Sequence, residues 1–196
     1  RTRLDGATRD GATWRARLSG PAGGGDEVRA KAIVNVGGPW VAKVLASVSS
    51  APTEASVRHV KGSHIVVPRV HPEAHAYILQ NADKRIVFVI PYEGRYTLIG
   101  TTDVPVTEFE RPEISESETG YLLDLANTYL ERPLARSDVV WSFSGVRPLY
   151  DDGKSDPSSI TRDYVLKLDA GAGGAEPPVL SVYGGKLTTY RKLAEA

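Results

Sequence analysis

The alternation of apolar and polar residues predicts a chain made mostly of strands, with a few helical segments between them. Runs with period-two alternation or many β-branched residues are typical of strands. The predicted strands cover residues 13–18, 27–36, 57–68, 76–80, 85–92, 95–101, 139–146, 162–168 and 178–183. Residues 20–25 and the pair Glu93-Gly94 lie between such runs and predict hairpin turns. We therefore expect antiparallel pairing through the middle of the chain. The mostly apolar, β-branched run from Ala32 to Val36 predicts a strand buried on both faces.

One longer helix is predicted between the strands. Ser115 and Glu118 have the spacing of a capping box, in which each residue satisfies a free backbone N–H of the other. An apolar stripe at helical spacing follows, formed by Tyr121, Leu122, Leu125, Ala126, Tyr129 and Leu130, and Pro133 closes it. We interpret this helix as a packing element and assign it no chemistry.

Two glycine pairs each stand between a predicted strand and a predicted helix. Gly37-Gly38 follows the run that ends at Val36, and its helix continues to about Ser47. Gly184-Gly185 follows Val179–Tyr183 and precedes Lys186 and a segment of helical composition, residues 187–196. Glycine lets backbone approach a ligand closely, and a helix N-terminus offers free N–H donors with a positive dipole. An ordinary strand-to-helix turn is the alternative at both places.

Composition excludes several classes of function. The net charge is zero, which removes a bulk electrostatic argument for binding nucleic acid. No apolar run approaches the roughly 18 residues that a bilayer-spanning helix needs. The absence of cysteine excludes disulfides and thiol chemistry, and no histidine pair has ligand spacing with carboxylates, so we predict no metal site. The absence of methionine and the start at Arg1 indicate an excised piece of a longer protein.

Five motifs, taken together and in this order, carry a resemblance to a known family. They are KGSHIVVP at residues 61–68, LIGTTD at 98–103, WSFSGVRPL at 141–149, ITRDY at 160–164 and GGKLTTYR at 184–191. The chain resembles the FAD-dependent, respiratory glycerol-3-phosphate dehydrogenases, which belong to the glycine oxidase and D-amino-acid oxidase-like flavoproteins. The resemblance covers residues 31–196. The combination of SGVRPL, ITRDY and GGKLTTYR is specific, whereas each alone is weak.

The resemblance implies an α+β fold with a discontinuous cofactor lobe. Residues 51–150 would form a substrate-binding lobe, mainly an antiparallel sheet, inserted between residues 1–50 and the return segment 151–196 of an FAD-binding lobe. Flavoproteins of this kind hold the cofactor pyrophosphate on a G-x-G-x-x-G turn between a strand and a helix. That N-terminal motif and the family's early Arg-Tyr substrate motif are missing here. We therefore expect most of the cofactor's phosphate site to lie outside this chain.

The resemblance also implies a reaction. The parent enzyme would oxidise sn-glycerol 3-phosphate to dihydroxyacetone phosphate by hydride transfer to FAD and pass the electrons to a quinone. It would be cytoplasmic, attached peripherally to the inner face of the membrane, and a homodimer is compatible with it. The alternatives are another FAD-dependent oxidoreductase acting on amines or hydroxy acids and, for this chain alone, an inert structural or binding module.

Two arginines and a histidine are the predicted substrate residues. Arginine offers a planar fork of donors to phosphate and keeps its charge, and the resemblance places Arg147 and Arg162 at the substrate. His64 is the predicted base, because an imidazole titrates near neutral pH; a hydrogen-bonded core histidine is the alternative. The segment Thr101–Asp103 ends a strand, where it could cap a turn or contact substrate.

Lys186 has three predicted roles, as a catalytic, substrate-binding and cofactor-binding residue. A cation and a helix N-terminus beside the flavin would stabilise the negative charge of its reduced form. The remaining predicted cofactor-binding residues are Gly37, Gly38, Gly185, Leu187 and Thr188.

Overall fold

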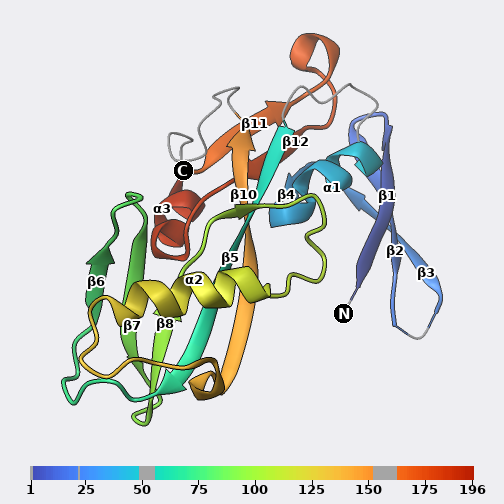
Figure 1. Ribbon diagram of the computed structural model, residues 1–196. Coiled ribbons are helices and arrows are strands. Elements are labelled where there is room, and N and C mark those ends of the chain that lie inside the picture. The colour runs from blue at the N-terminus through green and yellow to red at the C-terminus, as the bar shows by residue number, and fades with distance from the viewer. Residues whose placement is uncertain (1, 22, 49–55, 152–162) are drawn as a thin grey trace. The chain divides into compact units, whose positions relative to one another are not determined.

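The computed structural model describes residues 2–21, 23–48, 56–151 and 163–196. Contacts divide the chain into two compact units. Unit 1 combines Arg1–Arg58 with Pro148–Ala196, and unit 2 is the continuous segment His59–Arg147 (Figure 1). One unit is therefore assembled from both ends of the chain, while the other consists of its middle. Among the described residues, no helix has the length and apolar character needed to cross a membrane.

A six-stranded sheet forms the body of unit 2, and two of its strands continue across the boundary into unit 1. Its strands are β5 (Ser56–Pro68), β6 (Tyr77–Gln80), β7 (Ile86–Tyr92), β8 (Tyr96–Gly100), β9 (Val104–Pro105) and β10 (Trp141–Asp151). The order is β10-β5-β8-β7-β6, with β9 also paired to β5. Strands β5, β8, β7 and β6 pair antiparallel in sequence along this path, as predicted.

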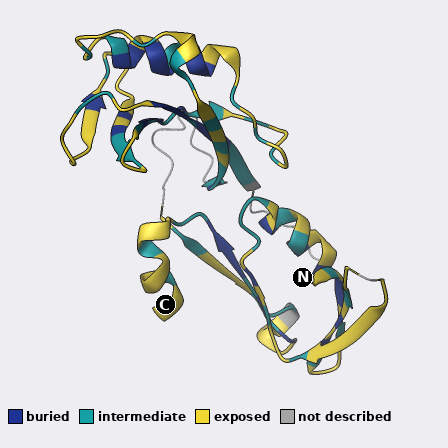
Figure 2. Ribbon diagram, turned by 90° about the horizontal axis from the view of Figure 1, so that it is seen from below, coloured by how far each residue is buried: buried dark blue, intermediate teal, exposed yellow. Residues whose placement is uncertain are grey.

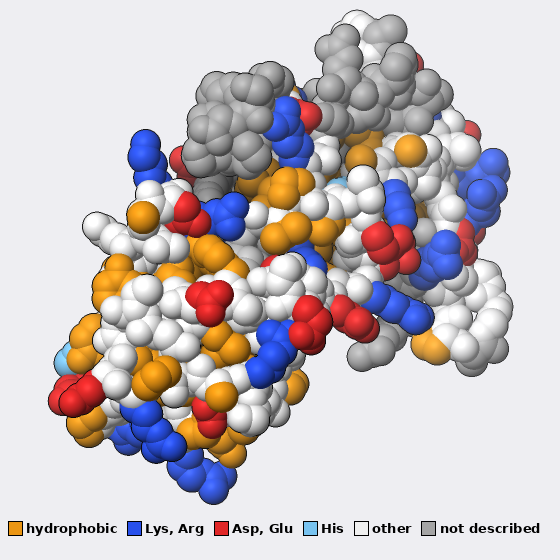
Figure 3. Space-filling model, in the orientation of Figure 1, with side chains coloured by type: hydrophobic (Ala, Val, Ile, Leu, Met, Phe, Trp, Pro, Cys, Tyr) orange, Lys and Arg blue, Asp and Glu red, His pale blue; other side chains and the backbone are white. Residues whose placement is uncertain are grey.

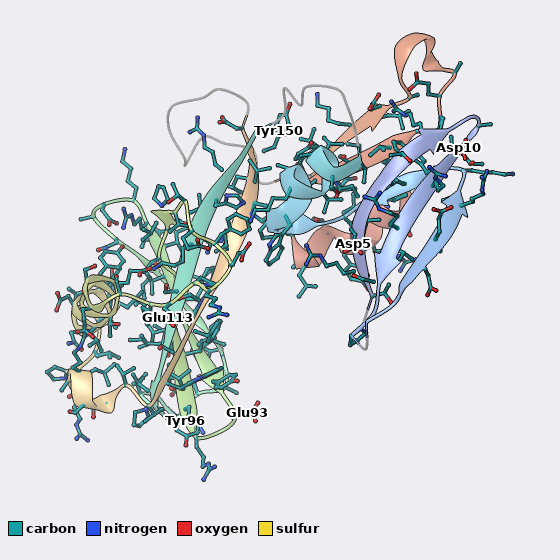
Figure 4. All side chains as sticks on the ribbon, turned by 90° about the vertical axis from the view of Figure 1, so that its right-hand side faces the viewer. Asp5, Asp10, Glu93, Tyr96, Glu113 and Tyr150 are labelled. Atoms are coloured by element: carbon teal, nitrogen blue, oxygen red, sulfur yellow. The ribbon has the colours of Figure 1, made fainter. Side chains whose placement is uncertain are left out.

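The turn between β7 and β8 confirms the predicted hairpin. Tyr92 pairs with Tyr96, and the two residues after Tyr92 have positive φ angles, 47° at Glu93 and 69° at Gly94. Two successive positive φ values give the backbone twist that matches the twist of the flanking strands. Glu93 and Tyr96 mark this end of the sheet in Figure 4.

Helix α2 (Glu116–Asn127) packs on one face of this sheet, and side chains from the helix and the strands form the core between them. The predicted capping box is confirmed, since Ser115 Oγ accepts from the Glu118 N–H and the Glu118 carboxylate accepts from the Ser115 N–H. Figure 2 shows buried residues between α2 and the strands. The buried core residues are Ile65, Val67, Leu79, Val87, Val89, Ile99, Leu122, Leu123, Leu125 and Ala126. Each large one contributes on the order of 1.5–3 kcal/mol. A short 3₁₀ turn, η2 (Arg136–Asp138), precedes β10.

Two three-stranded sheets build unit 1. The first is an antiparallel meander of β1 (Arg3–Asp10), β2 (Thr13–Ser19) and β3 (Gly25–Ala30). The second has the order β11-β12-β4, where β4 (Ile33–Asn35) runs parallel to β12 (Val179–Tyr183) and β11 (Val165–Asp169) runs antiparallel. The helical elements are η1 (Gly38–Trp40), α1 (Val41–Val48), η3 (Ala172–Gly174), η4 (Leu187–Thr189) and α3 (Tyr190–Glu195). These mainly antiparallel sheets with few helices confirm the α+β class.

Contacts across the whole length of the chain hold unit 1 together. Trp14 is 1 % exposed, and its indole N–H donates to the Pro178 carbonyl at 3.0 Å. Arg9 lies over the Trp14 ring and forms ion pairs with Asp169 at 3.1 Å and with Glu176 at 2.7 Å. These contacts fasten the C-terminal segment to the N-terminal meander.

The predictions for unit 1 were wrong in two places. Strand β1 was not predicted, and the predicted strand 27–36 is two strands that belong to different sheets, because the chain leaves β3 and joins β12 as β4. Val34 and Val36 are 60 % and 69 % exposed, so the expected burial on both faces is wrong among the described residues. The physical reason is that α1 packs on the face of β4 that bears Asn35, which is 2 % exposed.

On the face shown in Figure 3, Lys and Arg side chains lie interspersed with Asp and Glu side chains. This mixing accords with the zero net charge of the sequence and gives no extended basic surface on that face.

Candidate functional site

His64 and Arg147 lie over two glycines on the face of the unit 2 sheet opposite α2. Neighbouring strand residues point to opposite faces, so β5 directs Gly62 and His64 away from the helix and Ser63 toward it. A side chain at Gly62 would overlap the Arg147 guanidinium, and one at Gly100 would overlap the His64 ring. The two glycines therefore provide the space that the predicted arginine and histidine occupy.

The segment after β8 holds Arg147 in place. Its Nη1 contacts Asp103 Oδ1 at 2.6 Å and donates to the Thr102 carbonyl at 3.4 Å, and its Nη2 donates to Thr101 Oγ1 at 3.1 Å. An arginine has five N–H donors, so the contacts with described residues leave two for a ligand. The side chain is 31 % exposed. Arg147 is an ordered, half-enclosed cation, and Thr101–Asp103 contributes its partners.

His64 has an imidazole ring that stacks on an aromatic ring. Its ring lies 4.9 Å from that of Phe143, at an interplanar angle of 6°. Burial, followed by the positive charge of Arg147, lowers the pKa of His64 below its ordinary value. The imidazole is consequently uncharged at pH 7 and able to accept a proton. Its Nδ1 is buried and has no hydrogen-bond partner among the described residues, so Nε2 is the nitrogen that a substrate can reach.

A second polar cluster lies on the α2 side of the same strands. The Glu118 carboxylate accepts hydrogen bonds from Ser63 Oγ and Thr102 Oγ1, each at 2.8 Å, and forms an ion pair with Lys61 at 2.8 Å. The sequence predicted only the capping role of Glu118. A signal was present at Ser63, a polar residue that the strand period directs toward the core, but not at Thr102, which follows the end of β8.

Two glycine pairs lie at the same end of the small sheet in unit 1, just after its parallel strands. Strands β4 and β12 are parallel, with Asn35 opposite Ser181, so Gly37-Gly38 and Gly184-Gly185 follow the carboxyl ends of adjacent strands. Open sheets with parallel strands bind ligands at the carboxyl ends of those strands. The φ angles of Gly38, Gly184 and Gly185 are +54°, +70° and +92°. A side chain at Gly184 would also lie 2.7 Å from the Asp163 carbonyl.

Asn35 fixes the first of these turns. Its buried amide donates to the Val41 carbonyl at 2.9 Å and accepts from the Gly37 N–H at 3.2 Å. A buried amide with partners on both of its ends rigidifies the backbone that surrounds it. The turn from β4 into η1 is thus held by a side chain, while its glycines leave the backbone bare.

The second turn differs from the predicted helix start. The segment after Gly185 begins as the 3₁₀ turn η4, and the α-helix α3 starts only at Tyr190. Thr189 Oγ1 explains the delay, because it accepts from the Lys186 N–H at 3.2 Å and donates to the Lys186 carbonyl at 3.1 Å. Lys186, Leu187 and Thr188 are all exposed.

Comparison with known proteins identifies the family. A model of the family described as DAO, FAD dependent oxidoreductase, matches residues 1–191. The chain belongs to this family. FAD is accordingly the cofactor of the family, and the resemblance drawn from the five motifs is confirmed.

Individual relatives show which enzymes the chain is similar to. A glycerol-3-phosphate dehydrogenase of Pseudomonas aeruginosa is 50 % identical over 200 residues, which cover 100 % of this chain and 38 % of the relative. A D-erythritol 1-phosphate dehydrogenase of Brucella abortus is 52 % identical over 168 residues, or 85 % of this chain and 33 % of the relative. The chain spans about two fifths of the length of the curated relatives that it matches in full.

A solved structure supports the fold. The glycerol-3-phosphate dehydrogenase from Bacillus halodurans, complexed with FAD, matches with a TM-score of 0.78 and 27 % identity. The match covers 99 % of this chain and 36 % of that one. The FAD dependent oxidoreductase fold predicted from the motifs is therefore confirmed.

The structure brings together only some of the predicted site residues. His64 and Arg147 lie on the same face of the unit 2 sheet, and the glycine pairs follow the carboxyl ends of two adjacent strands in unit 1. Arg162 lies outside the described residues. Among the residues that the structure describes, no three histidine, aspartate or glutamate side chains gather as a metal site would require.

Proposed function

We propose that the enzyme containing this chain oxidises sn-glycerol 3-phosphate to dihydroxyacetone phosphate with FAD as the hydride acceptor. The observation that carries the proposal is that the imidazole of His64 and the guanidinium of Arg147 lie on the same face of the unit 2 sheet, opposite α2. Oxidation of a phosphorylated secondary alcohol needs a proton acceptor and an anion-binding group, and this face supplies both. The names of the similar dehydrogenases agree with that chemistry.

Arg147 is the proposed phosphate ligand. A bidentate arginine matches the oxygens of a phosphate group, and two N–H donors of Arg147 remain beyond its contacts with Thr101, Thr102 and Asp103. Asp103 neutralises the guanidinium in the absence of substrate and keeps it oriented. Arg162 is proposed to add a second cation, as the resemblance implies.

His64 is the proposed base. As the carbinol C–H bond breaks, the hydroxyl O–H proton passes to Nε2 of His64 and the carbon–oxygen double bond forms. The lowered pKa keeps the imidazole unprotonated at neutral pH, which is the state a base requires. Phe143 holds the ring in one plane by stacking on it.

The turns of unit 1 are suited to an extended, electron-rich cofactor. Bare glycine backbone at the ends of β4 and β12 allows close approach, and side chains at Gly37 or Gly184 would crowd the backbone there. FAD, when bound, accepts the hydride of the carbinol carbon. Gly37, Gly38 and Gly185 are proposed to contact it through their backbone, as are Leu187 and Thr188. Lys186 is proposed to place its charge where the cofactor becomes negative or where substrate phosphate binds.

Electron transfer to a quinone is a further part of the proposal. Quinones reside in the membrane, so the enzyme would lie peripherally on the inner, cytoplasmic face, and a homodimer is proposed for the whole protein. Binding of the purified enzyme to vesicles with and without ubiquinone, measured by co-sedimentation, tests this part. An enzyme that reduces ubiquinone only in detergent solution and never binds vesicles would contradict it.

A second candidate substrate is D-erythritol 1-phosphate, because a dehydrogenase named for it is 52 % identical to this chain. Both compounds carry a phosphate and a secondary alcohol, so the groups on the His64 face serve either one. Flavin reduction in the full-length enzyme separates them when kcat/KM is compared for glycerol 3-phosphate, D-erythritol 1-phosphate and glycine. A preference for glycine would favour the amine-oxidising alternative and overturn the proposal.

The chain alone is expected to bind FAD weakly or not at all. Its sequence has no G-x-G-x-x-G turn between a strand and a helix to hold the pyrophosphate. The absorbance spectrum of the purified 196-residue chain with added FAD measures this. A stoichiometric flavin peak after gel filtration would contradict the expectation, whereas a colourless chain would agree with an inert module in isolation.

A further inference from the structure

The side chain of Glu118 makes more contacts than a helix cap requires. Its Oε2 accepts from the Ser115 N–H at 2.9 Å, which is the cap, and pairs with Lys61 at 2.8 Å. Its Oε1 takes no part in the cap and accepts from the hydroxyls of Ser63 and Thr102. The residue is 5 % exposed. A buried carboxylate needs such donors, since it is an acceptor only and loses its hydration.

Both hydroxyl partners adjoin the residues of the His64 face. Ser63 stands between Gly62 and His64 in β5, and its N–H also donates to Thr102 Oγ1 at 3.0 Å. Consecutive strand residues point to opposite faces, so a contact that fixes Ser63 on the α2 side also fixes the direction of His64 on the other.

Thr102 has the same relation to Arg147. Its carbonyl accepts from Arg147, and its two neighbours, Thr101 and Asp103, are the other acceptors of that guanidinium. The hydroxyl of Thr102 is meanwhile held by Glu118. One carboxylate thus anchors the backbone segment that orients Arg147.

The network reaches β10 as well. The single hydroxyl hydrogen of Ser63 points to Glu118, so in the 2.8 Å contact between Ser63 Oγ and Ser144 Oγ the donor is Ser144. Ser144 follows Phe143, whose ring stacks on His64. Strand β5, strand β10 and the segment after β8 therefore meet at Glu118.

We propose that Glu118 is a positioning residue, whose carboxylate holds Ser63 and Thr102 so that His64 and Arg147 keep fixed places on the opposite face of the sheet. The inference rests on the proposed function, in which His64 and Arg147 act on the substrate. Lys61 completes the arrangement, because its ammonium balances the carboxylate and donates to the Glu113 carbonyl at 2.6 Å. Glu113, labelled in Figure 4, precedes α2.

The test compares two variants of helix α2 in the full-length, FAD-loaded enzyme. Glu118→Gln keeps the size of the side chain and removes its charge. We expect its rate constant for flavin reduction to fall tenfold to hundredfold, the loss typical of about 1 Å of misplacement, with unchanged flavin content. Asn127→Ala is the matched control, because it removes two hydrogen bonds with Leu134 at the other end of α2.

The control separates positioning from stability. Asn127→Ala should lower the melting temperature and keep the wild-type rate. If Glu118→Gln slows reduction no more than Asn127→Ala does, the proposal is overturned. Thr102→Val serves if Glu118→Gln does not fold, since it removes one hydroxyl and leaves the pair between Lys61 and Glu118 intact. If the losses in the rate of flavin reduction in Thr102→Val and Glu118→Gln add up fully in the double variant, a shared network would also be contradicted.

A measurement without turnover separates this inference from the proposed function. The stacked Phe143 ring shifts the ring-proton resonances of His64 upfield, and these can be assigned by their loss in His64→Asn. Glu118→Gln should move them, and Asn127→Ala should not. If the wild type fails to oxidise glycerol 3-phosphate while the resonances respond as expected, the proposed function fails and the positioning role stands. Unmoved resonances in Glu118→Gln overturn the positioning role.

Discussion

The two units prepare their candidate sites by opposite means. In unit 2 the candidate functional groups are the side chains of His64 and Arg147 on an antiparallel sheet. Neighbouring glycines leave room for both side chains, and Arg147 is held by polar partners. In unit 1 the candidate groups are mostly bare backbone, at glycines that end two parallel strands. A site of side chains can be changed one group at a time, whereas a backbone site fails only when its conformation fails. Substitutions in the two units should therefore have different kinetic signatures.

The largest effect is expected from removing the base in unit 2. His64→Asn keeps a similar shape and should lower the rate constant of flavin reduction by roughly 10²–10⁴-fold, because the proposed proton acceptor is lost. Substrate affinity should change little, since the phosphate contact belongs to Arg147. Single-turnover stopped-flow reduction measures both. Unchanged rate and pH dependence would return His64 to the role of a packed histidine.

Arg147→Ala should raise the KM for glycerol 3-phosphate and leave the flavin content unchanged. Losing a charge-assisted contact to phosphate costs about 2–4 kcal/mol, or roughly 30- to 1000-fold in KM. Steady-state kinetics together with flavin absorbance test this, and Arg147→Lys shows how much depends on the planar fork. A wild-type KM in Arg147→Ala would show that Arg147 has only a structural role, through its ion pair with Asp103.

Acid should weaken unit 2 through Glu118. Burial alone would raise the pKa of Glu118, but hydrogen bonds from Lys61, Ser115, Thr102 and Ser63 lower it to about 2. A lowered carboxyl pKa contributes stability that is complete above its unfolded value, near 4.5, and is lost as pH falls toward 2. The contribution is on the order of a few kcal/mol.

The measurement is urea unfolding of the wild type and of Glu118→Gln between pH 3 and pH 7. The difference in unfolding free energy between them should shrink as the pH falls. A difference that stays constant over this range would show that the ionised carboxylate does not stabilise the fold.

The smallest effect should come from the backbone site of unit 1. Gly184→Ala introduces a side chain at a φ of +70°, 2.7 Å from the Asp163 carbonyl. A non-glycine residue in that conformation costs about 1–3 kcal/mol, and the contact adds to it. Flavin occupancy should fall, while the KM of the enzyme that still carries flavin should stay normal.

Gly173→Ala is the control for Gly184→Ala. Its φ is +76°, and an added side chain meets nothing within 4 Å. It has the same conformational cost away from the strand ends, so it should lower stability and keep flavin occupancy. Equal loss of flavin in both variants would remove the end of β12 from the cofactor site.

The sequence predicted these regions unequally. In unit 2 the hairpin at Glu93 and Gly94 and the capping box of Ser115 and Glu118 were predicted, because each depends on residues a few positions apart. In unit 1 the single predicted strand 27–36 proved to be β3 and β4 in separate sheets. Its apolar residues are compatible with either sheet, and only long-range pairing divides them.

The sequence by itself indicated most of the strands and helix α2, where glycine bends the chain, and which residues could bind phosphate or accept a proton. These properties depend on local backbone preferences and side-chain chemistry. Tertiary structure alone decided that Glu118 meets Ser63, 55 positions away, and that β4 lies beside β12. Such contacts form where burial leaves polar groups without water, and each must then find a partner that only the folded chain brings near.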